Sequence, residues 1–364
     1  MPSVTVAGSN NQVFQINYNS TDVSGYAQSL ANTINAAVKS GQLSTFTYTG
    51  GATAPGPATG TGGQVVIGSV PGSAISIPNT DSVIVDNAAG PSSIFGGSAV
   101  SALIAGGGGL TFVSGVPVGV ENIVAGDTAN YIVTANTGGG TYNIATGAGN
   151  DTVGVFTGNS TVNAGTGSNK IQLGTGNSFV FSVGSDSVVG NITPVGSPGA
   201  GGTDTVDVLS GNVTINPGSS NFFVFGNDLN PVTLLAGSGS DTVALGIGGG
   251  TVTAGTGGNS LLVGGLNTTG TAVLTGSASG DRLYAIGYGT VVATAGAGNE
   301  TISGAGGAPY GGSPSFADNR FTAGSGNDTL LAGRGLDTLT AGTGKASLVA
   351  GTAADTFAFQ NHSE

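Results

Sequence analysis

A nine-residue period runs through most of this chain and limits what the chain can fold into. The period is clearest near the C-terminus, where AGSGNDTLL, AGRGLDTLT, AGTGKASLV and AGTAADTFA follow one another without a gap. From residue 138 the frame recurs in steps of nine, with breaks at 190–200, 262–268 and 303–315 and one extra residue before residue 228 and before residue 296. Counted from the copy GAGNDTV, the seventh position is apolar every time. These residues are Ile144, Val153, Val162, Ile171, Val180, Val189, Val206, Ile215, Val224, Leu234, Val243, Val252, Leu261, Leu274, Leu283, Val292, Ile302, Phe321, Leu330, Leu339, Leu348 and Phe357.

Such a repeat predicts an all-β fold, a parallel β-roll or β-solenoid of nine-residue half-turns. Each nine supplies a glycine-rich turn and a short strand with one large apolar side chain pointing inward, and two nines close one coil. Stacked coils pair their backbones as parallel strands and bury a continuous apolar column. The three breaks in the period are expected to be loops that leave single coils.

The first part of the chain has a different pattern. Strand-like alternation in SVTVAG and QVFQINY is followed, in residues 20–41, by apolar residues spaced as on one face of a helix. Ser20, Thr21 or Asp22 is placed to cap its start, and Gly41 is expected to close it in the left-handed conformation. The expected organisation is an N-terminal α/β cap with one helix over 1–50, a Gly/Pro linker over 51–63, an irregular β region over 64–137, the solenoid over 138–359 and a tail over 360–364.

Composition narrows the classes of function. The chain has 364 residues, of which 71 are Gly, and its formal net charge is −12 with the basic residues scattered along it. This charge disfavours nucleic acids and anionic membrane surfaces as partners, and no apolar run is long enough for a membrane span. There is no Cys, which excludes thiolate metal sites and disulfides, and no secretory signal is visible at the N-terminus.

The residue types of the chain give little support for an enzymatic function. The single histidine lies near the C-terminus, and neither an HExxH zinc-protease motif nor a GxSxG nucleophile elbow is present. A β-helix lyase or epimerase would place charged groups on one face, and the candidates are Asp281 with Arg282, Asp318 with Arg320, and Arg334. Solvated surface charges are the favoured interpretation, so we predict that the protein is not an enzyme and has no catalytic residues.

The repeat resembles the G-G-x-G-x-D-x-U-x nonapeptide of RTX proteins, the calcium-binding parallel β-rolls of type I-secreted bacterial proteins. The best matches are AGSGNDTLL, AGRGLDTLT, AGTAADTFA, TGAGNDTVG and AGSGSDTVA. The resemblance implies turn glycines in conformations closed to other residues, with carbonyl oxygens facing an ion that Asp carboxylates of neighbouring coils complete. Many copies replace the Asp, so Ca²⁺ is expected at a few places only. The implied ligands are Asp337, Asp355, Gly333, Gly335, Gly351, Asp328, Asp281, Glu300, Asp241 and Asp151, with Asp337 and Asp355, eighteen residues apart, as the best pair.

Two other interpretations of the repeat stay open. Asp and Asn can act as turn formers that stack between coils as hydrogen-bonded ladders, without a metal. Thr and Ser next to the apolar position, among them Thr152, Thr205 and Thr242, form a row of hydroxyl groups that suits ice or a glycan, although Thr also favours any exposed strand.

These features and the resemblance predict an extracellular bacterial structural protein. It would self-assemble into filaments or a surface or biofilm matrix through a calcium-stabilised β-solenoid, as bacterial surface-layer and matrix proteins with related repeats do. The alternative is a monomeric calcium-dependent adhesin or an ice- or glycan-binding module. The expected partners are further copies of the chain, with glycan or cell-surface contact as a second possibility. The expected route out of the cell is type I secretion.

Overall fold

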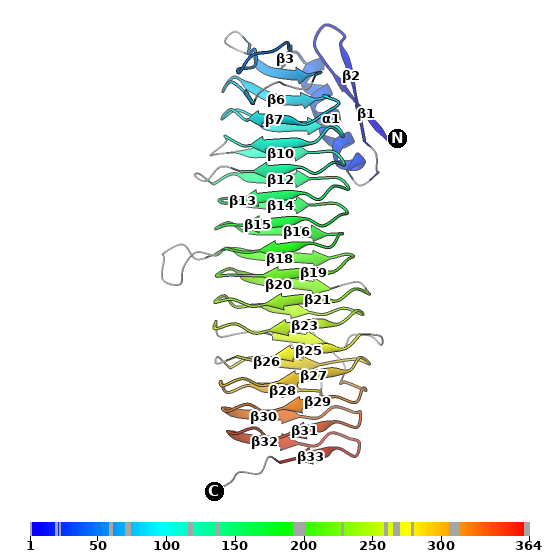
Figure 1. The fold of residues 1–364 in the computed structure, drawn as a ribbon, viewed down its shortest axis with the longest axis vertical. Helices are drawn as coiled ribbons and strands as arrows, with labels where there is room; N and C mark the ends of the chain where they lie inside the picture. Colours follow the sequence, from blue (N-terminus) through cyan, green and yellow to red (C-terminus); the bar gives the residue numbers. More distant parts are fainter. Residues whose placement is uncertain are drawn as a thin grey trace. The chain divides into compact units, whose positions relative to one another are not determined.

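The computed structural model describes residues 2–18, 21, 23–57, 61–69, 74–115, 119–134, 139–191, 201–226, 229–257, 261–264, 270–277, 280–305 and 314–359. The chain divides into two compact units, Met1–Asp186 and Ser187–Glu364. Each unit is a β-solenoid, as the nine-residue period predicts, and unit 1 also carries the N-terminal helix (Figure 1).

Unit 1 holds two sheets of parallel strands. The strands of the first, the helix-side sheet, are β3 (Leu43–Tyr48), β4 (Gly62–Ile67), β6 (Asp81–Asp86), β8 (Ala102–Ala105), β10 (Val120–Val124), β12 (Thr141–Ala145), β14 (Asn159–Asn163) and β16 (Ser178–Ser182). The strands of the opposite sheet are β5 (Ile75–Ser76), β7 (Ser92–Phe95), β9 (Leu110–Val113), β11 (Tyr131–Val133), β13 (Thr152–Val155) and β15 (Lys170–Leu173). From β4 onward the chain alternates between the sheets, so each coil contributes one strand to each.

Register places like residues above one another in the interior of unit 1. Ile84, Leu103, Ile123, Ile144 and Val162 are aligned across five neighbouring strands of the helix-side sheet, and all are at most 2% exposed. This column is the core that the seventh repeat position predicts, and it extends toward the N-terminus beyond the region where the period is regular in sequence.

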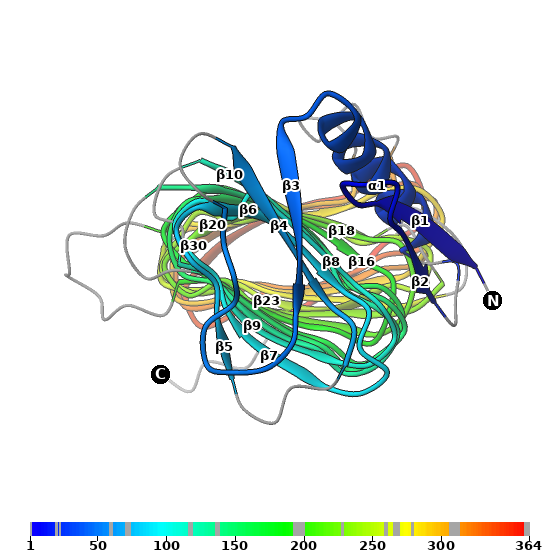
Figure 2. The same cartoon turned by 90° about the horizontal axis from the view of Figure 1, so that it is seen from above.

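The N-terminal element covers the outer face of the helix-side sheet. The antiparallel hairpin of β1 (Ser3–Ala7) and β2 (Val13–Asn17) and the helix α1 (Ser24–Lys39) lie beside the coils (Figure 2). They share one hydrophobic cluster with outward-facing residues of the sheet, including Val66, Val85, Ile104, Val124 and Ala145. Because those strands are buried on both faces, they read as continuous apolar runs such as QVVIG and SVIVD.

The C-terminal end of the helix is as predicted, but its N-terminal end is not. Gly41 follows it with φ of 73°, which confirms the predicted left-handed closure. At the start, however, the N-cap residue is Val23, which makes no side-chain capping bond. The carbonyl oxygen of Thr21 accepts from the hydroxyl and the backbone N–H of Ser24, at 2.8 and 3.2 Å. Ser20 and Asp22, the other two predicted caps, lie outside the described residues.

The solenoid begins earlier than the sequence indicated. β3, in the range assigned to the cap, already pairs in parallel with β4, which starts inside the predicted linker. Residues 64–137, expected to be irregular, contribute strands to the same two sheets as the regular repeats. Coils here are longer, and the pairing Ile123↔Ile144 spans 21 residues rather than 18, which hides the period in the sequence.

Unit 2 repeats this architecture. One sheet consists of β18 (Thr203–Val208), β20 (Asn221–Gly226), β22 (Thr242–Ala244), β24 (Leu261–Gly264), β26 (Arg282–Ala285), β28 (Thr301–Ser303), β30 (Asn327–Leu331) and β32 (Lys345–Val349). The other consists of β17 (Ser187–Val189), β19 (Val213–Asn216), β21 (Val232–Leu235), β23 (Gly250–Thr253), β25 (Ala272–Thr275), β27 (Val291–Thr294), β29 (Arg320–Thr322), β31 (Thr338–Thr340) and β33 (Thr356–Ala358). The predicted loops at 190–200 and 303–315 lie mostly outside the described residues, and the break at 262–268 begins inside β24.

Two of the predicted inward positions in unit 2, Val189 and Val292, are wrong by one residue, and the backbone pairing of β24 is shifted by one residue from the predicted frame. Val188, not Val189, aligns with the buried Ile215, and Leu262, not Leu261, aligns with the buried Val243. In β27 the buried residues are Val291 and Ala293, and Val292 is aligned with the exposed Arg320. The extra residue predicted before residue 296 therefore lies between Leu283 and Ala293, one repeat before the predicted place. Each error falls on a pair of adjacent apolar residues, so hydrophobicity could not decide which one points inward.

Candidate functional site

Turn carboxylates and amides of unit 1 form a ladder between coils. The backbone N–H and Nδ2 of Asn130 both donate to Oδ1 of Asp151, at 2.7 and 2.9 Å. The Asp151 N–H donates to Oδ1 of Asn169 at 2.8 Å, and the N–H and Nδ2 of Asn169 donate to Oδ1 of Asp186 at 3.1 and 2.8 Å. All four side chains are at most 3% exposed. These bonds are the metal-free ladder that the sequence left open.

Asp337 and Asp355 belong to a second ladder, in unit 2. The pairing of β31 with β33 brings them together, as their spacing predicts, and the Asp337 N–H donates to Oδ1 of Asp355 at 3.0 Å. Oδ1 of Asp337 accepts from the N–H and Nδ2 of Asn319 at 2.7 and 2.8 Å. The second oxygen of each carboxylate accepts from a backbone N–H of its own turn. Asp337 Oδ2 accepts from the Gly333 N–H at 2.5 Å, and Asp355 Oδ2 accepts from the Gly351 N–H at 2.6 Å. Both carboxylates thus use both oxygens as acceptors.

The predicted glycine ligands serve the stacking of coils. A Cβ on Gly335 would overlap the carbonyl oxygen of Ala317, and one on Gly351 would overlap that of Gly333. None of Gly333, Gly335 and Gly351 has a positive φ, so the conformations implied by the resemblance are not found at these three positions. The Gly333 carbonyl accepts from the Thr352 N–H at 3.3 Å. Close approach of the preceding coil is the reason for glycine here.

The other predicted ligands lie in similar turns. The Glu300 N–H donates to Oδ1 of Asp328 at 3.0 Å, and the Gly324 N–H donates to its Oδ2 at 2.7 Å. Glu300 Oε2 accepts from Gly296 at 2.6 Å, and Asp281 Oδ2 accepts from the Ser277 N–H and hydroxyl at 2.8 and 3.0 Å. Oδ1 of Asp241 accepts from the Phe222 N–H at 3.0 Å. Each of these carboxylates accepts at least one backbone N–H.

Burial shifts the ionisation of these groups. Loss of water raises the pKa of Asp151 and of Asp241 to about 6, although donated hydrogen bonds lower it in part. Burial, with smaller contributions from the charges of Asp328 and Asp281, raises the pKa of Glu300 to about 7. Burial also raises the pKa of Asp337. Oδ2 of Asp151, Oδ2 of Asp241 and Oε1 of Glu300 are buried without a hydrogen-bond partner, and so can hold a proton.

The structure does not gather the predicted ligands around one shared calcium site among the described residues. Calcium needs six to eight oxygen ligands, whereas most carboxylate oxygens of the predicted ligands already accept N–H or O–H donors. Within the described ranges, no group of three or more Asp, Glu, His or Cys side chains is placed to share a metal. The calcium sites therefore stay a prediction from the resemblance, while the ladder accounts for the same residues without a metal.

The sequence reasoning missed three members of the ladders. Asn130 lies before the regular frame begins. Asn319 occupies the Asp position of the copy that ends with Phe321, but as an Asn it was not among the predicted ligands. Asp186 lies 17 residues after Asn169 instead of 18, because the coil that contains it is shortened by one residue. These three residues could have been identified from the sequence by another signal, an Asn or Asp placed directly before a short apolar strand.

Calcium should leave the thermal stability unchanged. We expect the same melting temperature in millimolar CaCl₂ and in EDTA, measured by circular dichroism, because the ladder oxygens are already paired with donors. The matched variant carries Asp337→Asn and Asp355→Asn, since Asn fills the equivalent position at Asn319. A calcium-dependent rise in melting temperature that this variant loses would restore the calcium prediction.

The predicted hydroxyl row and the predicted surface charges lie on the outside. Thr205 and Thr242 point outward, but Phe223 stands between them in register, so the row is interrupted where a flat ice- or glycan-binding face would need continuity. Asp318 and Arg320 line one shallow hollow of about 450 Å³, where Asp318 Oδ1 accepts from the Leu336 N–H at 2.8 Å.

The remaining predicted surface charges are separated from one another. Asp281 is buried while Arg282, next to it, is exposed. The Arg334 guanidinium lies 5.1 Å from the ring centre of Phe316. A cation over an aromatic face is a stabilising surface contact and needs no catalytic role.

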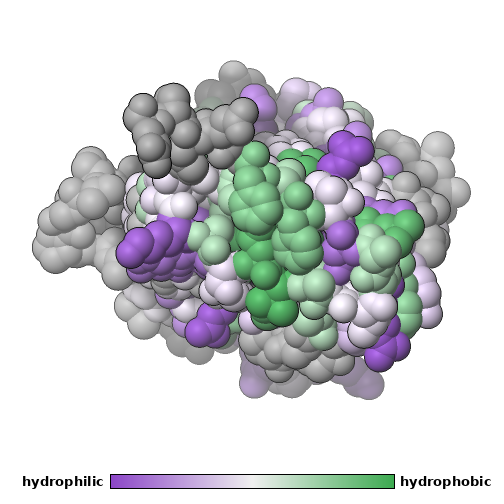
Figure 3. Space-filling model, turned by 90° about the horizontal axis from the view of Figure 1, so that it is seen from below, coloured by the Kyte–Doolittle hydropathy of each residue, from purple (hydrophilic) through white to green (hydrophobic). Residues whose placement is uncertain are grey.

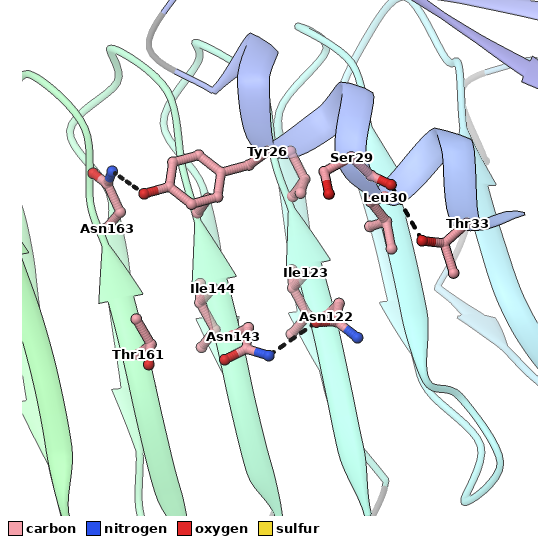
Figure 4. Close-up of a pocket in the computed structure, with 12 residues that line it drawn as sticks. Tyr26, Ser29, Leu30, Thr33, Asn122, Ile123, Asn143, Ile144, Thr161 and Asn163 are labelled. Carbon is pink, nitrogen blue, oxygen red and sulfur yellow. Dashed lines mark hydrogen bonds between the residues drawn. The ribbon is translucent and has the colours of Figure 1, made fainter.

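A cleft of about 320 Å³ lies between α1 and the outer face of the helix-side sheet (Figure 4). From the helix it is lined by Tyr26 and Leu30, and from β10, β12 and β14 by Asn122, Asn143 and Thr161, among others. Asn143 Nδ2 donates to Oδ1 of Asn122 at 2.9 Å. Every side chain that lines the cleft is uncharged.

The last described coil of unit 2 exposes an apolar face (Figure 3). Val349, Phe357 and Phe359 are 45%, 38% and 75% exposed. One coil earlier, Leu330 and Leu339, the register partners of Leu348 and Phe357, are fully buried. The seventh-position residues of the last coil are therefore core residues with nothing stacked on them among the described residues.

Comparisons with known proteins identify no relative of this chain. No family model, no curated protein and no solved structure matches the chain. Among the described helices, none is long and apolar enough to cross a membrane.

Proposed function

We propose that this chain is a structural protein of the cell exterior that associates with further copies of itself through the last described coil of unit 2. The observation that carries the proposal is the apolar face of that coil (Figure 3). Clustered exposed apolar side chains of this kind favour protein association, because covering them removes apolar surface from water.

The backbone of the same coil supports association. β32 pairs only with β30, and β33 pairs only with β31, among the described strands. Each therefore keeps one edge along which N–H and C=O groups can pair with another chain. A second copy presents the same strand edges and the same apolar face. Two copies can therefore associate through identical surfaces.

The rest of the described chain supports a scaffold. The buried turn carboxylates are used as hydrogen-bond acceptors between coils, and the coils differ little in architecture from one end of a unit to the other. The resemblance of the repeat to secreted parallel β-rolls supports a place at the cell exterior. Filaments, a surface layer or a biofilm matrix are the assemblies that such a subunit would build. This proposal requires no calcium.

The proposal is tested by measuring mass against concentration. We expect light scattering coupled to size exclusion to show dimers or larger species as concentration rises, with pairs or filaments in negative-stain micrographs. The variant Val349→Lys with Phe357→Lys should remain monomeric, because charges would be buried in the contact. Leu235→Lys is the matched control, since Leu235 is 57% exposed on β21 of the same unit. A monomer at every concentration, or equal association of both variants, would contradict the proposal.

A further inference from the structure

The cleft beside α1 is distinct from the associating face and lies entirely in unit 1. We propose that it binds a neutral oligosaccharide, with successive sugar rings lying along the outward side chains of β10, β12 and β14. The proposal does not depend on self-association.

The floor of the cleft presents polar groups at a regular spacing. Asn122, Asn143 and Thr161 are aligned in register on three neighbouring parallel strands, which lie about 4.8 Å apart. That spacing is close to the length of one sugar ring. The bond from Asn143 Nδ2 to Asn122 fixes the amide and turns Oδ1 of Asn143 toward the Thr161 side of the cleft (Figure 4). Carboxamides and hydroxyls in alternation can both donate to and accept from sugar hydroxyls.

The helix supplies the apolar wall. Tyr26 is 48% exposed, and its hydroxyl accepts a hydrogen bond from Nδ2 of Asn163 at 3.3 Å, which holds the ring beside the strands (Figure 4). Leu30 lies one helical turn further along the same wall. An aromatic ring with a polar tip offers an apolar surface to the C–H groups of a sugar and a hydrogen bond to its hydroxyls.

The surroundings disfavour other ligands. β10, β12 and β14 each have a partner strand on both sides, so an extended peptide has no sheet edge to join here. The lining carries no charge, and the chain has a net charge of −12, which opposes nucleic acids and acidic polysaccharides. Neutral, hydroxyl-rich chains are the class that the cleft matches.

The test is titration calorimetry of the whole protein with three hexasaccharides. We expect cellohexaose, which is neutral and extended, to bind, maltohexaose, which is neutral and curved, to bind more weakly, and hexagalacturonate, which is anionic and extended, to give no signal. Absence of binding by both neutral sugars, or tightest binding of the anionic one, would overturn the proposal.

Substitutions assign the binding to the cleft. Tyr26→Ala and Asn143→Ala should each weaken cellohexaose binding by about tenfold or more. Tyr131→Ala is the matched control, because Tyr131 is also 48% exposed but lies on β11 of the opposite sheet, and it should bind as the unchanged protein does. Equal losses in the Tyr26 and Tyr131 variants would place binding elsewhere. Circular dichroism confirms that each variant is folded, and light scattering of the same variants shows that association is unaffected.

Discussion

Lowering the pH from 7.5 to 5 should raise the melting temperature of this protein by about 5 °C or more, the reverse of ordinary acid denaturation. The reason is a set of buried carboxyl groups whose pKa is raised by loss of water. It is about 6 for Asp81, Asp86, Asp151 and Asp241 and about 7 for Glu121 and Glu300.

The direction of this change in stability follows from comparing proton binding in the folded and unfolded states. In the unfolded chain these groups titrate near their ordinary pKa of about 4, so between pH 7 and 4 the folded state binds protons that the unfolded state does not. Stability therefore increases as the pH falls through 7 and 6, and it levels off below the unfolded pKa. Each group contributes about 1 kcal/mol across this window. Asp81 is an example, because both its oxygens are buried without a hydrogen-bond partner.

Asp241→Asn separates this effect from a general effect of pH. The amide removes one buried charge and keeps an acceptor for the Phe222 N–H, so the variant should be more stable than the unchanged protein at pH 7.5 and equal to it at pH 5. The measurement is a set of thermal scans by circular dichroism at fixed ionic strength. A melting temperature that falls steadily from pH 7.5 to 5 would show that these carboxyls are better solvated than the structure indicates.

Gly324→Ala should destabilise unit 2 by about 3 kcal/mol. The added Cβ would overlap the carbonyl oxygen of Gly296 in the preceding coil, and its three nearest neighbours are all backbone atoms, which leaves no flexible side chain to give way. The same residue donates its N–H to Oδ2 of Asp328, so moving the turn also weakens the ladder. Urea unfolding followed by circular dichroism measures the loss.

Gly25→Ala is the control, because it makes the same change from Gly to Ala at a position outside the stacked coils. Gly25 is exposed in α1 and has no positive φ, and a methyl group added to it would meet no atom within 4 Å. Ala there should stabilise the protein by about 0.5–1 kcal/mol, because it favours the helix and restricts the unfolded chain. Equal effects of the two substitutions would mean that coil stacking does not exclude a side chain at Gly324.

The architecture was predictable because one position of the repeat is apolar in every copy. That regularity fixes strand spacing and the direction of the inward side chain, and it correctly placed Asp337 beside Asp355. It failed where two apolar residues are adjacent, as at Val188 and Val189, since either can fill the core. It also failed where coil length changes, which hid Asp186 from the ladder.

The role of the N-terminal region depends on contacts that the period does not encode. Outward-facing Val85 and Ile104 signal that something covers the sheet, but only the folded chain shows that α1 does so. The cleft was equally invisible, because Tyr26 and Asn143 are far apart in sequence and each is unremarkable alone. The calcium prediction rested on the resemblance of the repeat and on the spacing of its Asp residues, whereas the hydrogen-bond partners of those residues become visible only in three dimensions.

The ladder has a direction along the chain. At each rung the earlier residue provides the N–H and the later residue provides the oxygen, as from Asn130 to Asp151, from Asn169 to Asp186 and from Asp337 to Asp355. Within the ladders, the backbone N–H of each residue is therefore bonded by a side chain of the coil synthesised after it. During synthesis each emerging coil would close the open donor of its predecessor, so growth of the solenoid and satisfaction of its buried polar groups proceed in the same order.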